Sequence, residues 1–358
     1  MSELVTDPVA GTVVAVLCAD ASEAVIGEVI ADLRHVEDRQ ALTTDSAGAA
    51  AAITDLVEAT NQQVFAPDPL AASIAALASS APAEPAAAAA SHAGVGIRPI
   101  ETHADVAAAV TVLDGVFAPG RGYHFYPPSL LRNLLAAGAP MLLAWDGDAP
   151  VGVVLAVPGW TASGQPLVQS GPMAVLPTAR GRGVAVALKL AQRAWALERG
   201  VTEIRWTFDA MAAVSANLNL RRLGATVAGF VPGYEGLRDA DTPTSLPYDR
   251  LLVTWRLAGA SETPDNGNAE PVWAVAAVEG LPVLNHAWSL ARSALVAVPA
   301  DIAALRREDP AAASTWQHIV GAVLQHAFTA GWRVNWDSRG AYLLTAPQIL
   351  PGHRYGQP

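Results

Sequence analysis

Apolar and polar positions in the middle of the chain follow two different periods in succession. Residues 167–175 form an apolar run typical of a buried strand, and Pro177 prevents its hydrogen-bond ladder from continuing. Over residues 184–197 the apolar positions recur at intervals of three and four, which predicts an amphipathic helix. Arg199 and Gly200 suit the last turn and the residue that follows it. The pattern therefore predicts a buried strand, a turn and a long helix.

Similar patterns predict the elements on both sides of this unit. Before it we expect a strand at 97–100, helices at 103–117 and 130–137 joined by a loop at 118–129, and a hairpin of strands 141–145 and 151–157. After it we expect a strand at 203–208, a helix at 214–223, and strands at 226–230 and 249–257. Together they predict an α/β (α+β) fold, a mixed and mostly antiparallel sheet with flanking helices.

Composition divides the chain into four parts. Residues 1–65 predict a small N-terminal α/β unit, expected to serve packing or homodimer formation. Residues 66–96 are rich in Ala, Pro and Ser, which is typical of a linker or a loosely packed helix. The main domain covers 97–258, and a polar break at 259–269 separates it from an α/β extension at 270–350, which holds five of the ten tryptophans.

Both terminal parts carry their own element signals. In the first part the pattern predicts a strand at 12–18 and helices at 21–33 and 47–61. In the last part it predicts a strand at 295–298, a helix at 310–330 closed by Gly331, and a strand at 332–336.

Charge and composition exclude several kinds of partner. With 22 basic and 33 acidic residues the net charge is −11, which argues against nucleic acid and anionic membranes as partners. No apolar run approaches the length of about 18 residues that a membrane span needs, and the start of the chain lacks a basic signal region, so a cytoplasmic location is expected. The single cysteine, Cys18, suits core packing, and the eight histidines show no metal-binding spacing.

The turn between the central strand and helix is suited to bind an anion. A helix N-terminus presents free N–H groups and the positive end of a dipole. Gly181 and Gly183 let a phosphate approach the backbone, and Arg180 and Arg182 can add charge-assisted hydrogen bonds. A Walker loop is excluded, because Lys189, the only lysine, lies too far along the helix. A plain glycine-rich turn remains the alternative to the anion site.

These residues carry a resemblance to a known family. Val175, Pro177, Arg180, Gly181, Gly183 and Ala185, followed by the helix, resemble the acyl-CoA motif of the GNAT superfamily of acyl-CoA-dependent N-acyltransferases. Residues 206–225, Tyr234, Gly236 and the PYDR of 247–250 are similar to a bacterial branch of predicted GNAT acetyltransferases, and this similarity runs from residue 97 onward. The resemblance implies the GNAT acyltransferase fold and direct transfer, in a ternary complex, of the acyl group of acetyl-CoA or another short acyl-CoA to the amine of a small molecule, with no metal.

The resemblance also implies which residues hold the cofactor. In superfamily members the strand equivalent to 167–175 splays from its neighbour, and the pantetheine arm lies in the gap. The Val175 N–H is then the expected donor to the thioester oxygen. The implied cofactor contacts are Met173, Ala174, Val175, Arg180, Gly181, Arg182, Gly183, Val184, Ala185 and Asn219.

The catalytic groups depart from the family pattern. Much of the superfamily uses a tyrosine as the acid, and Leu220 stands at that position here. The candidates for proton transfer are Asp209, Tyr234 and Glu235. Each has a structural alternative: Asp209 could cap a helix, Tyr234 could be a packed aromatic of a loop, and Glu235 could be an exposed carboxylate.

Four residues are candidates for binding the acceptor amine: Tyr123, His124, Asp249 and Arg250. The departure from the family pattern at Leu220 leaves two other functions open. One is a non-catalytic acyl-CoA-binding or sensor protein of GNAT fold. The other is a GNAT-fold enzyme that uses succinyl-CoA or a carrier-protein thioester, or that hydrolyses a thioester.

Overall fold

The structure, a computed structural model, describes residues 5–6, 13–14, 83–118, 123–234, 248–257 and 270–347 of the chain. In the first part, β1 (Val5–Thr6) and β2 (Val13–Val14) pair antiparallel. The helices expected at 21–33 and 47–61 lie outside the described residues, as does the candidate Glu235.

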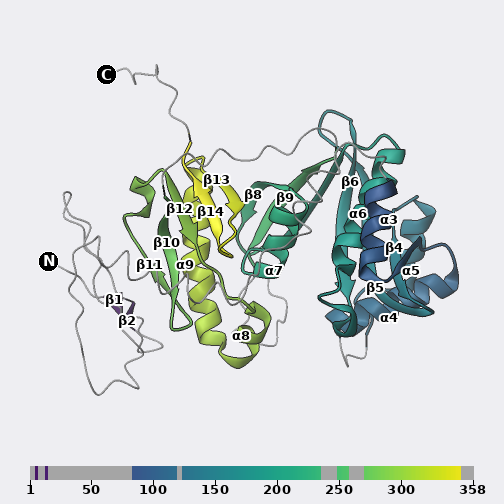
Figure 1. Cartoon of the computed structure of the whole chain (residues 1–358), viewed down its shortest axis with the longest axis horizontal. Coiled ribbons are helices and arrows are strands. Elements are labelled where there is room, and N and C mark those ends of the chain that lie inside the picture. Colours follow the sequence, from purple (N-terminus) through teal and green to yellow (C-terminus); the bar gives the residue numbers. More distant parts are fainter. Residues whose placement is uncertain are drawn as a thin grey trace.

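A seven-stranded sheet forms the centre of the expected main domain (Figure 1). Its strands stand in the order β3-β4-β5-β6-β7-β9-β8, and every neighbouring pair is antiparallel except β6 and β7. The strands are β3 (Gly96–Pro99), β4 (Leu142–Asp146), β5 (Ala149–Trp160), β6 (Pro166–Val175), β7 (Glu203–Asp209), β8 (Thr226–Val231) and β9 (Arg250–Arg256). The expected mixed, mostly antiparallel sheet is confirmed.

Helices cover both faces of this sheet. Because side chains of a strand alternate between faces, Val153 packs with α4 (His103–Phe117) and α5 (Pro128–Ala136), whereas Val154 packs with α6 (Val184–Glu198). After β7 the chain forms a short helix, α7 (Ala213–Ala216), which continues as a π-helix, Asn217–Arg222.

The end of the stretch expected as a linker is a packed helix. Residues Ala83–Ala93 form α3, which lies along α6 on the face of the sheet away from α4. Ala93 is buried among side chains of β4, β5 and α6. Alanine-rich sequence permits this close approach, because the small side chains let two helices lie side by side.

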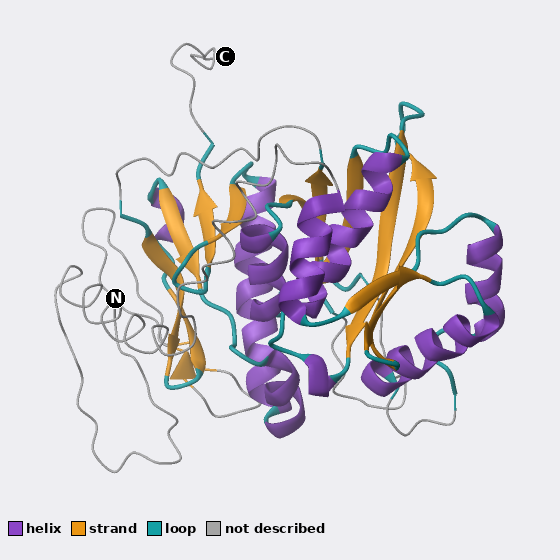
Figure 2. Cartoon of the chain, turned by 45° about the vertical axis from the view of Figure 1, so that its right-hand side comes forward, coloured by secondary structure: helices purple, strands orange, loops and turns teal. Residues whose placement is uncertain are grey.

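The C-terminal part has its own five-stranded sheet. The strand order is β11-β10-β12-β14-β13, and Figure 2 shows the strands of the molecule in two groups with long helices between them. The elements are β10 (Val272–Val278), β11 (Leu281–Leu284), β12 (Ser293–Val296), α8 (Ile302–Glu308), α9 (Pro310–Thr329), β13 (Arg333–Trp336) and β14 (Tyr342–Thr345). The patterns had indicated only β12, α9 and β13.

The two sheets share one hydrophobic core. All five tryptophans of the C-terminal part are buried within it. Phe230 of β8 stacks on Phe328 of α9 with ring centroids 6.3 Å apart, and the Tyr342 hydroxyl donates a 2.8 Å hydrogen bond to the Ala210 carbonyl. The C-terminal part is therefore packed directly against the end of β7. Among the described residues, no helix has the length and apolar character that crossing a membrane requires.

Candidate functional site

The parallel strands β6 and β7 pair only near their beginnings. Val168 stands opposite Ile204 and Gln169 opposite Arg205, and no further pair joins the two strands in the described sheet. β7 stays paired with β9 along its full length, and β6 stays paired with β5. A gap therefore opens in the sheet toward the carboxyl ends of β6 and β7.

A β-bulge bends β6 at the start of this gap. The register with β5 passes from Val154–Met173 to Ala156–Ser170, so that Gly171 and Pro172 share one partner position. A bulge of this kind bends the strand and increases its twist. Proline also has no N–H with which to extend a ladder toward β7. The Gly-Pro pair thus accounts for the separation of the strands.

The free edge of β6 presents main-chain groups to the gap. The Leu176 N–H donates a 2.9 Å bond to the Val151 carbonyl of β5. Consecutive residues of a strand direct their N–H groups to opposite sides, so the N–H groups of Val175 and Met173 face away from β5 into the gap. The Arg180 Nε donates a 3.2 Å bond to the Val175 carbonyl, which holds this guanidinium at the mouth of the gap.

The glycine turn at the same end has an open backbone. Gly181 has φ of 76° and Gly183, the N-cap of α6, has φ of 94°, both in the left-handed region that glycine adopts readily. A Cβ added at Gly181 would meet nothing within 4 Å, so the backbone is open there. The first bond of α6 runs from the Ala187 N–H to the Gly183 carbonyl at 3.0 Å, which leaves the preceding N–H groups outside the helical ladder.

Arg182 is held on the other side of the turn. Its guanidinium donates to the Asp146 carboxylate at 2.6 Å and to the carbonyls of Ala93 and Gly94 at 3.1 and 3.3 Å. It thereby caps the C-terminal end of α3 and ties it to β4. Although Arg180 and Arg182 were both expected at the phosphate, the structure places only Arg180 at the mouth of the gap.

Lys189 is buried beneath the point where the strands part. Its side chain lies on α6, and the residue is only 2% exposed. The amino group donates to the Ser170 hydroxyl at 2.8 Å and to the Gln192 Oε1 at 3.4 Å, and it lies 4.0 Å from the centre of the Trp206 ring. Burial lowers the pKa of this amino group to about 7. The sequence pattern had not led us to expect a buried lysine at this point, although the position of the only lysine within an apolar helix could have indicated it.

Asp209 and Asp249 lie at the junction with the C-terminal part. Asp209 binds Arg306 of α8 at 2.5 Å and accepts a 2.9 Å bond from the Met211 N–H. Burial raises the pKa of Asp249, against the opposing effect of the bond from the Gly233 N–H. The structure thus gives the carboxylate of the candidate base Asp209 an ion pair between the two parts of the chain.

The remaining candidates near this junction are spread over several elements. Arg250 donates to the side chain and the carbonyl of Thr207 across the β7–β9 pair, at 3.1 and 3.0 Å. Tyr234 is 53% exposed, and its N–H donates to the Tyr248 carbonyl at 3.1 Å. Asn219 is buried on the π-helix beside the buried Leu220.

The loop between α4 and α5 holds a histidine in a fixed position. The His124 Nδ1 lies 2.7 Å from the Asp114 carboxylate, whose other oxygen accepts a 2.8 Å bond from the Phe125 N–H. Asp114 precedes Gly115, where an added Cβ would lie 3.0 Å from the Leu176 side chain just beyond β6. Tyr123, the other acceptor candidate, is 56% exposed. Asp114 was not among the residues expected at the site.

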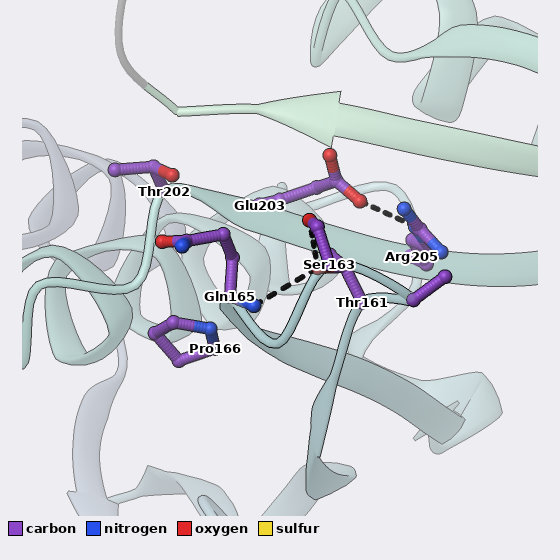
Figure 3. A pocket seen from close by; sticks show the side chains of 8 residues that line it. Thr161, Ser163, Gln165, Pro166, Thr202, Glu203 and Arg205 are labelled. Carbon is purple, nitrogen blue, oxygen red and sulfur yellow. Dashed lines mark hydrogen bonds and ion pairs between the residues drawn. The ribbon is translucent and has the colours of Figure 1, made fainter.

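A pocket lies at the opposite end of β6 and β7. Its volume is about 530 Å³, and it is lined by the hairpin turn at 161–166 and by residues 202–205 (Figure 3). Glu203 and Arg205 form an ion pair on its wall. Because the lining residues lie before or within the paired section of the two strands, the pocket is on the other side of that section from the gap. Within the described part of the chain, no group of three His, Cys, Asp or Glu side chains could hold a metal ion.

Comparison with known proteins identifies the family of the domain that contains the gap. Residues 115–225 match the family model "Acetyltransferase (GNAT) family". No curated protein matches the chain.

Solved structures with a similar fold cover slightly less than half of the chain. One is the ribosomal-protein-S18-alanine N-acetyltransferase from Escherichia coli, with 16% identity, a TM-score of 0.37, and coverage of 48% of this chain and 98% of that one. Another is an acetyltransferase of the GNAT family from Streptococcus pneumoniae, with 15% identity, a TM-score of 0.37, and coverage of 46% and 99%. A third is Arabidopsis thaliana NAA60 in complex with acetyl-CoA, with 17% identity, a TM-score of 0.37, and coverage of 45% and 99%.

The family match spans the separated strands, the glycine turn and α6. The chain therefore contains an acetyltransferase domain of the GNAT family.

Proposed function

We propose that this protein transfers a short acyl group, acetyl in the first instance, from acyl-CoA to the amine of a small molecule in a ternary complex. The observation that carries the proposal is the separation of β6 and β7 directly beside a glycine turn at a helix N-terminus. A linear thioester with a diphosphate at its far end needs both features. The gap between β6 and β7 can hold the linear thioester, and the glycine turn can bind the diphosphate.

The turn supplies the diphosphate site. N–H groups at the start of α6 and the positive end of its dipole favour an anion. Arg180 adds a charge-assisted donor at the mouth, where its contact with the Val175 carbonyl already positions it. Arg182 contributes indirectly, because its bonds to α3 and Asp146 fix the outer side of the turn.

The edge of β6 aligns the substrate. The N–H groups of Val175 and Met173 face the gap and can pair with amide carbonyls or the thioester oxygen. Because β5 fixes this strand in advance, little reorganisation accompanies binding. Holding two reactants at a fixed separation and angle is one of the larger contributions available to an enzyme of this kind.

The amine has to lose a proton before it can react. We assign the role of base to His124, since Asp114 holds its Nδ1 and leaves Nε2 as the ring nitrogen that can accept the proton. Asp209 is less suited, because Arg306 pairs with its carboxylate. Tyr234, exposed in the turn that follows β8, is the candidate donor to the departing thiolate. A small cationic amine also suits a chain with a net charge of −11.

Calorimetry with the full chain tests the binding step. We expect CoA and acetyl-CoA to bind, and Arg180→Ala to weaken both by about tenfold, as the loss of one charged hydrogen bond predicts. Arg199→Ala is the matched control, because it removes an exposed arginine from the other end of α6. The absence of any heat with CoA and its esters in the unaltered protein would refute the proposal.

A non-catalytic acyl-CoA-binding protein is the second candidate function. It is favoured by Leu220, a buried leucine at the position where much of the superfamily has a tyrosine acid. Free-thiol release from acetyl-CoA with and without a panel of amines separates the two functions. Binding without amine-dependent thiol release would support the sensor.

A further inference from the structure

We propose that the inner end of the gap accepts an acyl group that carries its own carboxylate, and that Lys189 pairs with that carboxylate. The inference rests on the proposed function and specifies the acyl class, a monothioester of a short dicarboxylic acid such as succinate or malonate.

The amino group of Lys189 lies at the vertex of the gap. The last pair between the two strands is Gln169–Arg205. The next residue is Ser170 on β6 and Trp206 on β7. The Lys189 amino group contacts both of them, at 2.8 Å from the Ser170 hydroxyl and 4.0 Å from the centre of the Trp206 ring. It therefore contacts each strand at the first residue beyond the last pair.

The acyl end of a bound thioester points toward this vertex. A substrate anchored by its diphosphate at the turn enters at the carboxyl end of β6. It then runs back along the strand past the N–H groups of Val175 and Met173. Ser170 is the next residue beyond the bulge whose side chain faces α6. The group attached beyond the thioester carbonyl is consequently the part of the substrate nearest to Lys189.

The buried amino group has only neutral partners. Its hydrogen-bond acceptors are a hydroxyl and a side-chain amide, and its third contact is the face of an aromatic ring. Within the described part of the chain, no carboxylate forms an ion pair with Lys189, and burial is the cause that lowers its pKa. Burying an ammonium without a counter-charge is expensive, and an aliphatic side chain would fill the same space at lower cost. A ligand carboxylate supplies the missing charge.

An acetyl group offers nothing to this amino group, whereas a succinyl or malonyl group brings an anion to it. Pairing would also raise the pKa of Lys189, because a nearby negative charge favours the ammonium form. When the solution pH lies above the pKa of Lys189 in the ligand-free protein, binding of the carboxylated thioester should therefore be accompanied by the uptake of a proton.

Calorimetry at pH 8 tests both consequences in the full chain, with CoA, acetyl-CoA and succinyl-CoA as ligands in two buffers of different ionisation enthalpy. We expect succinyl-CoA to bind at least about tenfold more tightly than acetyl-CoA, as a charge-assisted pair predicts. We also expect succinyl-CoA to take up close to one proton per site in excess of the uptake measured with CoA.

Two variants identify the source of these effects. Lys189→Met keeps the length of the side chain and removes the charge, so it should abolish the preference and the proton uptake while CoA affinity stays within about twofold. Lys189→Arg keeps a positive charge and should retain the preference, which covers the case in which the methionine variant does not fold.

The outcomes distinguish a failure of the Lys189 assignment from a failure of the proposed function. Equal affinity for the two esters, or a preference that survives in Lys189→Met, would overturn the assignment of Lys189 while leaving the proposed function intact. A failure of CoA itself to bind the unaltered protein would remove the proposed function, and this inference with it.

Discussion

Replacing Lys189 by methionine should stabilise the ligand-free protein and change how its stability depends on pH. Burial lowers the pKa of this amino group from its ordinary value of 10.5 to about 7. At about 1.4 kcal/mol for each tenfold change in proton affinity, the shift corresponds to roughly 5 kcal/mol when the solution pH lies below both values. In Lys189→Met, the loss of the hydrogen bond to Ser170 and of the contact with Trp206 reduces this gain in stability by about 1 kcal/mol each.

The sign of the pH dependence follows from the two pKa values. Between pH 7 and 10.5 the unfolded chain holds a proton on Lys189 that the folded chain has lost. The contribution of Lys189 to the free energy of unfolding therefore rises with pH across this window, by up to about 1.4 kcal/mol for each pH unit. Below the window this contribution does not change with pH. In Lys189→Met that rise should be absent.

Urea denaturation of the two proteins at pH 6.5, 7.5, 8.5 and 9.5 measures the difference directly. The variant should exceed the unaltered protein by roughly 2 to 4 kcal/mol at the lowest pH, and the difference should shrink as pH rises. Arg199→Ala, on the exposed end of the same helix, serves as the control and should leave the pH profile unchanged. Parallel pH profiles for the unaltered protein and Lys189→Met would refute the claim that the buried amino group is uncompensated.

Three further changes test other parts of the molecule. Arg182→Ala should lower the free energy of unfolding by about 1 to 3 kcal/mol, because it leaves α3 uncapped, while Arg180→Ala should leave it unchanged; equal effects in urea denaturation would contradict the division of roles between the two arginines. Asp114→Asn should reduce turnover by about 10² or more with little change in CoA affinity, because it weakens the acceptor that orients the histidine; an unaltered turnover number would exclude that histidine as the base. Gly321→Ala places a Cβ 2.9 Å from the Asp249 carboxylate and should cost about 1 to 3 kcal/mol; calorimetric affinity for CoA should not change, and a large loss would mean that the junction reaches the gap.

The strand, turn and helix around the glycine turn could be predicted because their limits are set locally. Pro177 ends β6, and Gly200, with φ of 70°, follows the end of α6. These signals act over a few residues, so the sequence pattern contains them in full. The same holds for α4, whose N-cap Thr102 and Asp105 form a capping box.

The contacts that give the site its character could not be predicted in this way, because their partners are far apart in sequence. Arg182 meets Ala93 across 89 positions, and Arg306 meets Asp209 across 97. Nothing near either arginine indicates that its charge is already engaged. The bulge opposite Leu155 likewise depends on the register of β6 against β5, which the period of two along one strand does not fix.

The walls of the gap are held by separate sets of contacts. β6 is bound to β5, up to the bond between the Leu176 N–H and the Val151 carbonyl just past its end. β7 is bound to β9, and the C-terminal part fixes its far end through the Arg306–Asp209 pair and the bond from the Tyr342 hydroxyl to the Ala210 carbonyl. Neither set depends on a ligand in the gap.

Since each strand is anchored on the side away from the gap, closing the gap would require breaking the contacts of β6 with β5 or those of β7 with β9 and the C-terminal part. The C-terminal part can therefore be understood as a support that keeps β7 in place and preserves the proposed binding site in the absence of substrate. A preformed site loses little free energy to reorganisation, which favours both affinity and stabilisation of developing charge. This accounts for the large buried contact between the two sheets, in which Phe230, Phe328 and Tyr342 all take part.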